Sequence, residues 1–154
     1  MASTALRIRF EMGKSLYHQG KLRTAMSIYG GFPTGSTYTP QARYFSGVIL
    51  VNEGMTATTE GDELLAAQRF PQATVVFREV QTLPSSTLEH VEVRDLSILA
   101  VARVLLEQGA IAEAIAEYSR IGSASSYYED ALYEMIWANI MAASQLDVRD
   151  VDGN

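Results

Sequence analysis

The feature that most constrains this chain is its similarity to itself at a spacing of 34 residues. When the sequence is shifted by that spacing, apolar and small residues fall on like residues in both halves. The matched pairs are Phe10 with Tyr44, Gly13 with Gly47, Leu16 with Leu50, Gly20 with Gly54, Ile98 with Leu132, Val101 with Met135, and Ala102 with Ile136. A period of this length is typical of repeat proteins, in which each unit buries its apolar face against its neighbours.

Each repeat is predicted to fold as two amphipathic helices. In the third repeat, apolar residues recur at helical spacing from Ile98 to Leu106, and Gly109 then ends the helix. A second helical pattern follows at once, from Ile111 to Ile121. The sequence therefore predicts an all-α fold, built as an α-solenoid of antiparallel helix pairs.

The small and aromatic residues of these helices resemble the tetratricopeptide repeat. That repeat has a small residue in its first helix, a glycine at the turn, and an alanine followed four residues later by an aromatic residue in its second helix. The corresponding triplets are Gly13, Ala25 and Tyr29; Gly47, Ala73 and Phe77; and Ala102, Ala114 and Tyr118. The stretch from Ala131 to Trp137 looks like the first helix of a fourth repeat. The segment from Tyr118 to Asn139 is similar to repeats of bacterial cell-envelope scaffold proteins.

The resemblance covers most of the chain and implies a single domain over residues 1–154, a tetratricopeptide-like superhelix of about three and a half repeats. The repeats are expected at about residues 6–38, 40–84 and 95–126, with a partial repeat at 129–148. The fourth repeat has Ala143 where the turn glycine should stand. Residues 144–154 are polar, and we expect them to form a flexible tail.

The second repeat carries about 14 additional residues, at 55–68. Its expected turn glycine, Gly54, lies 19 residues before the alanine of its triplet, Ala73, whereas the same spacing in the first repeat is five. We expect Met55 to Asp62 to form a loop, with Asp62 capping the helix that follows. The insertion is either a tolerated loop or a pair of longer helices, or it is a binding element that emerges on one face.

Composition and charge exclude several classes of function. The formal net charge is −6, and the twelve Lys and Arg residues form no dense run, which argues against nucleic acid or anionic lipid as the partner. It contains no cysteine, which excludes disulfides and thiolate metal sites. We find no secretory signal and no apolar run long enough to insert into a membrane. The compartment stays open: cytoplasmic, or periplasmic if the domain comes from a longer chain.

Short motifs that resemble reactive or ligand-binding sequences each lack an essential part. His18 and His90 have no second metal ligand at a suitable spacing. The segment 30–37 resembles a phosphate-binding loop, but it lacks the lysine and follows a helix rather than a strand. The group Asp147, Asp150, Asp152 and Gly153 resembles the start of a calcium loop without its closing glutamate. We therefore predict a protein that is not an enzyme and uses no metal or cofactor.

The resemblance implies that the first helices of the repeats line a concave groove, which receives a segment of another protein. Aromatic and basic side chains at these positions suit a protein interface. The residues placed there are Phe10, Lys14, Tyr17, Tyr44, Val48, Val51, Asn52, Leu99, Arg103, Leu106, Tyr133, Trp137 and Met141. Lys14 and Arg103 could each meet a carboxylate of the partner. We expect an interaction module or scaffold. The alternative is self-association through Tyr127 to Met141, as an oligomerisation or structural domain of a larger bacterial envelope assembly.

Overall fold

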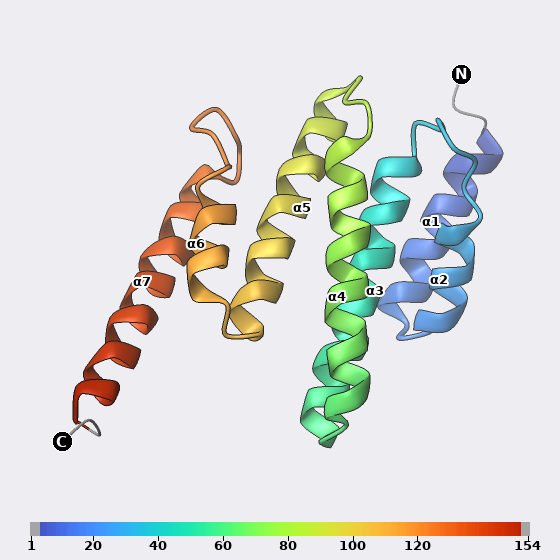
Figure 1. The fold of residues 1–154 in the computed structure, drawn as a ribbon. Helices are drawn as coiled ribbons and strands as arrows, with labels where there is room; N and C mark the ends of the chain where they lie inside the picture. The colour runs from blue at the N-terminus through green and yellow to red at the C-terminus, as the bar shows by residue number, and fades with distance from the viewer. Residues whose placement is uncertain (1–3, 152–154) are drawn as a thin grey trace. The chain divides into compact units, whose positions relative to one another are not determined.

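The computed structural model describes the backbone of residues 4–151 and the side chains of residues 4–144 (Figure 1). Over these residues the chain forms seven helices and no strand, which confirms the predicted all-α class. The helices are α1 (Thr4–His18), α2 (Leu22–Gly30), α3 (Thr39–Glu60), α4 (Glu63–Thr82), α5 (Leu88–Glu107), α6 (Ile111–Tyr118) and α7 (Tyr128–Val151). No helix in this described part is long and apolar enough to cross a membrane.

The chain divides into two compact units within α5. Unit 1 comprises residues Met1–Arg94, and unit 2 comprises residues Asp95–Asn154. In unit 1, α2 packs beside α1 and α3, and α4 runs along α3 (Figure 1). In unit 2, α6 packs against α7. The helix α7 extends through Val151, so the backbone is helical over most of the expected tail, and residues 152–154 lie outside the described residues.

Three helical hairpins turn at a glycine in the left-handed conformation. Gly20, Gly61 and Gly109 have φ angles of 74°, 79° and 75°. Such angles are strained for a residue with a Cβ atom, which is why glycine ends these helices. The structure agrees with the sequence at Gly20 and Gly109 and differs in the second hairpin, where the turn is Gly61 and not Gly54.

The insertion in the second repeat forms helix, and the prediction of a loop over Met55 to Asp62 was wrong. α3 continues through Glu60, and the side chain of Asp62 caps α4 as expected, accepting a hydrogen bond from the Leu65 N–H at 3.0 Å. Both helices are longer by seven residues, which is about two turns each. Because both grow equally, the packing between them stays in register.

A repeated contact shows this register. A Cβ atom on Gly47 would lie 2.5 Å from the ring of Phe77, and a Cβ atom on Gly54 would lie 2.9 Å from the ring of Phe70. Gly54 lies seven residues after Gly47, and Phe70 lies seven residues before Phe77. Gly54 therefore serves as a second small residue beneath an aromatic ring, and not as the turn glycine that the sequence predicted.

The two units share one local structure at a spacing of 89 residues, which is the distance from Gly20 to Gly109. Equivalent hydrogen bonds close both turns and both of the following loops. In the turns, backbone N–H groups donate to carbonyls: Gly20 to Tyr17 and Gly109 to Leu106 (both 2.9 Å), and Lys21 to Leu16 (2.9 Å) and Ala110 to Leu105 (2.8 Å). In the loops, the N–H groups of Tyr38 and Tyr127 donate to the side-chain hydroxyls of Ser36 and Ser125 (both 3.2 Å). The segment α1–α2–α3 of unit 1 is thus repeated as α5–α6–α7 in unit 2.

Each unit has its own core at these equivalent positions. Unit 1 buries Phe10, Ala25, Tyr29, Phe32, Ala42 and Ile49. Unit 2 buries Ile98, Leu99, Ala102, Ala114, Tyr118, Ile121 and Ala131. The alanines allow the helices to approach closely, and one tyrosine in each unit fills the space between them.

Candidate protein-binding surface on the last helix

A groove in unit 2 collects five of the residues predicted to bind a partner. Its volume is about 380 Å³. The predicted residues that line it are Arg103, Leu106, Tyr133, Trp137 and Met141. Glu107, Tyr118 and Glu134 also line it. We call it the α5–α7 groove, because helices α5 and α7 supply all of its lining except Tyr118 of α6.

Glu134 organises the floor of this groove by accepting hydrogen bonds from Arg103 and Tyr118. It accepts from Arg103 Nε at 2.9 Å and from Arg103 Nη2 at 2.5 Å, in a bidentate pair. It also accepts from the hydroxyl of Tyr118 at 2.9 Å. Arg103 was expected to meet a carboxylate of the partner, and in the structure it pairs with the chain's own Glu134.

The surroundings of this network shift two pKa values in opposite directions. Burial raises the pKa of Tyr118, and its hydrogen bond to Glu134 adds to the effect. Burial also acts to raise the pKa of Glu134, but the hydrogen bonds from Arg103 and Tyr118 and the charge of Arg103 outweigh it, so the pKa of Glu134 is lowered. The carboxylate is therefore charged at neutral pH and holds Arg103 in place.

The outward side of α7 carries a row of exposed apolar side chains beside the groove. Tyr133, Ile136, Trp137 and Ile140 are 75%, 60%, 57% and 52% exposed. Their spacing of three, four and seven residues places them on one side of the helix. We call these four residues the α7 face. Single exposed apolar residues are common on proteins, and a contiguous row of four makes the α7 face a candidate interaction surface.

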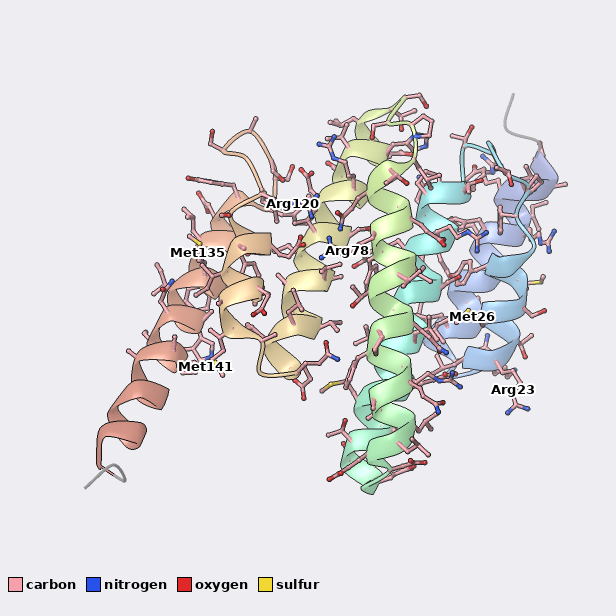
Figure 2. The ribbon with its side chains drawn as sticks, in the orientation of Figure 1. Arg23, Met26, Arg78, Arg120, Met135 and Met141 are labelled. Atoms are coloured by element: carbon pink, nitrogen blue, oxygen red, sulfur yellow. The ribbon has the colours of Figure 1, made fainter. Side chains whose placement is uncertain are left out.

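The opposite side of α7 holds the helix against unit 2. Ala131 and Ala138 are buried, and Met135, labelled in Figure 2, packs against the core of the unit. Apolar residues thus occur on both sides of this helix. A helix that is apolar all round is normally covered on all sides, whereas the α7 face is exposed in this structure.

Two residues predicted for the groove belong to the cores instead. Phe10 is 7% exposed and lies in an aromatic cluster with Tyr29, and Leu99 is 1% exposed. They occupy equivalent positions on α1 and α5, on the side that packs against the second helix of each hairpin. Their side chains are therefore not free to bind a partner.

The other predicted residues of unit 1 form contacts within the unit. Asn52 donates a hydrogen bond from Nδ2 to the hydroxyl of Tyr17 at 3.1 Å. Lys14 pairs with Glu11 at 3.1 Å. The ring of half-buried Tyr44 lies 5.6 Å from the ring of Phe77 in α4, and Val48 is half-buried on α3. The α5–α7 groove contains none of these residues of unit 1.

The remaining short motifs have structural surroundings. His90 is buried: its Nε2 donates to the carbonyl of Thr37 at 2.9 Å, and its Nδ1 accepts from the Ser86 N–H at 3.3 Å. His18 is exposed at the end of α1. Residues 31–38 connect α2 to α3. The residues that resemble a calcium loop lie outside those whose side chains are described. Among residues 4–144, no three His, Asp or Glu side chains gather closely enough to hold a metal ion.

Comparison with protein-family models, with curated proteins and with solved structures finds no match to this chain. Any function must therefore be argued from the surface itself.

Proposed function

We propose that this chain is a helical-repeat scaffold of the tetratricopeptide type, which binds another protein through the α7 face and the adjoining α5–α7 groove and catalyses no reaction. The observation that carries the proposal is the row of four large apolar side chains on α7, each more than half exposed. Covering them would remove a large apolar area from water, which is the main driving force of protein association.

The repeated hairpins support the choice of a repeat scaffold. A small residue of the first helix meets an aromatic ring of the second at Gly13 and Tyr29 and at Gly47 and Phe77, and Ala102 and Tyr118 share one core cluster. These are the positions that carry the resemblance to the tetratricopeptide repeat. In a solenoid of this kind, stacked helices hold the binding surface in place, so the partner can bind without a conformational change.

The residue types on the surface also suit protein binding. Tyrosine and tryptophan are frequent anchors of interfaces, because they bury a large area with few rotatable bonds. Tyr133 and Trp137 belong both to the α7 face and to the groove. The ion pair between Arg103 and Glu134 fixes the groove floor beside them, so a partner would meet a preformed site.

Site-specific photo-crosslinking in the source cell tests this proposal. A photoreactive amino acid at Ile136 should yield an adduct with a protein, and the adduct should disappear when Tyr133 and Trp137 are both replaced by alanine. Leu64 on α4 is 73% exposed and provides the matched control position. An equal yield of the same adducts from Ile136 and Leu64 would show that the α7 face is not a specific surface.

A further inference from the structure

We propose that the α7 face binds α1 of a second copy of this chain, in a head-to-tail contact. The inference rests on the proposed function, in that it names the partner of the same surface. Three features of the described residues carry it: the charge of unit 2, the charge of the first hairpin, and an exposed apolar side of α1.

Unit 2 is acidic around the α7 face. Over residues 95–144 there are seven acidic residues and two basic ones, which gives a charge of −5. Both arginines, Arg103 and Arg120, pair with glutamates of the same unit. Glu129 and Asp130 are exposed one turn before Tyr133 and lie on the same side of α7, and Glu107 lines the groove. The apolar face is thus bordered by carboxylates, and a partner with basic residues beside an apolar patch would complement it.

The first hairpin of the chain has the opposite charge. Its basic residues are Arg7, Arg9, Lys14, Lys21 and Arg23, and its only acidic residue is Glu11, which gives a charge of +4 over residues 4–30. Glu11 is itself paired with Lys14. Arg7, Lys21 and Arg23 are exposed, and Arg23 is labelled on α2 in Figure 2. The chain therefore contains the basic surface that its own acidic unit lacks.

Two exposed apolar residues lie on α1 of this basic hairpin. Ile8 and Met12 on α1 are 62% and 50% exposed, and their spacing of four residues places them side by side. We call these two residues the α1 patch.

The α7 face is exposed where the equivalent side of α3 is covered. Tyr133 and Ile136 correspond to Tyr44 and Gly47 of α3, and in unit 1 both of these lie against Phe77 of α4. The surface that α4 covers on α3 is therefore exposed on α7. A second copy of the chain can cover it with its α1 patch, and the opposite charges favour this pairing.

The charges disfavour the symmetric alternative, in which α7 of one copy packs on α7 of another. That arrangement would bring the carboxylates of Glu129 and Asp130 into a second acidic unit, and like charges at an interface are repulsive. When α1 of one copy binds α7 of another, the resulting dimer still has one free α1 and one free α7. It therefore leads to a closed ring or to an open chain of copies.

Sedimentation velocity of the full chain and of two matched variants tests the inference. Ile8→Glu/Met12→Glu disables the α1 patch, and Ile136→Glu/Ile140→Glu disables the α7 face while leaving the lining of the groove intact. All four substituted side chains are at least half exposed, so both variants should keep the wild-type far-ultraviolet dichroism spectrum. Leu64→Glu is the control for adding one glutamate at an exposed apolar position.

We expect the mass of the wild type and of Leu64→Glu to rise with concentration, and we expect this association to weaken about tenfold from low to high salt because charges steer it. Each double variant alone should stay monomeric. An equal mixture of the two should form a one-to-one complex and nothing larger, since one intact α1 then meets one intact α7.

Three results would overturn the inference: a monomeric wild type at all concentrations, association of the α1 variant alone as in the wild type, or association that neither variant changes. The second result would indicate the symmetric α7 contact. If the wild type is monomeric and Ile136 still crosslinks to a different protein, the proposed function stands and only the second copy is excluded as the partner.

Discussion

The two units of this protein differ in the surroundings of two tyrosines at equivalent positions, Tyr29 and Tyr118. In unit 1, Tyr29 stacks on Phe45 with ring centroids 5.3 Å apart and planes 14° apart, and its buried hydroxyl has no hydrogen-bond partner among the described residues. In unit 2, Tyr118 donates to Glu134, which stands at the position equivalent to Phe45. The same backbone therefore accommodates either an aromatic stack or a charged network.

The surroundings explain which arrangement each unit uses. In unit 1, α4 covers α3, and an apolar side chain at Phe45 adds to a closed core. In unit 2, the corresponding part of α7 borders the α5–α7 groove, where Arg103 is half exposed. The groove keeps Arg103 near water, and the hydrogen bonds from Arg103 and Tyr118 outweigh the desolvation of the more buried Glu134. The equivalent position thus contributes to internal packing in unit 1 and to an accessible surface in unit 2.

The largest expected effect tests the packing that both units share. Gly13→Leu should lower the free energy of unfolding by about 3 kcal/mol, because even a Cβ atom there would lie 2.7 Å from the ring of Tyr29. Urea denaturation followed by circular dichroism measures the change. Gly30→Leu is the matched control, since a Cβ atom at Gly30 meets nothing within 4 Å. Equal midpoints for the two variants would contradict the placement of Gly13 beneath Tyr29.

The next effect concerns the tyrosine of unit 2. Tyr118→Phe should lower the free energy of unfolding by about 2 kcal/mol, because it removes a hydrogen bond to a charged carboxylate and leaves the ring in place. Hydrogen exchange of the amides of α6 and α7 measures the loss within unit 2. Unchanged protection there would mean that the Tyr118 hydroxyl contributes no more than that of Tyr29, and the contrast between the units would fail.

Sequence alone reached the all-α class, the hairpin turns at Gly20 and Gly109, and the cap at Asp62, because each depends on local properties such as helical periodicity and glycine conformation. It misplaced the turn of the second hairpin, since the choice between Gly54 and Gly61 depends on where Phe70 of α4 packs against α3. It placed Arg103, Tyr133 and Trp137 together, as the groove does, but it put Phe10 and Leu99 there too. It missed Glu134, Ile136 and Ile140, whose roles depend on which side of α7 the rest of the unit covers. The apolar residues on both sides of α7 were the available signal.

A smaller effect is expected from the charge of Glu134. Its pKa is lowered in the folded state, so it contributes stability that is fully present above the ordinary glutamate value of 4.5 and is lost as the pH falls below it. The wild type should therefore exceed Glu134→Gln in stability by on the order of 1 kcal/mol at neutral pH, and the gap should narrow in acid. Urea midpoints at several pH values measure it, with the exposed Glu113→Gln as control. A gap that is constant with pH would show that the carboxylate charge does not stabilise unit 2.

The smallest effect, and the one opposite in sign, is expected at Tyr29. Tyr29→Phe removes a buried hydroxyl that has no hydrogen-bond partner among the described residues, so the free energy of unfolding should stay the same or rise by up to about 1 kcal/mol. The stack on Phe45 needs only the ring, which the substitution keeps. Tyr29→Phe and Tyr118→Phe remove the same hydroxyl group from equivalent positions. The difference between their changes in the free energy of unfolding therefore isolates what the hydrogen bond to Glu134 adds to unit 2. A loss of about 1 kcal/mol or more in Tyr29→Phe would show that this hydroxyl is also paired, and unit 1 would then hold a polar contact at the centre of its aromatic cluster.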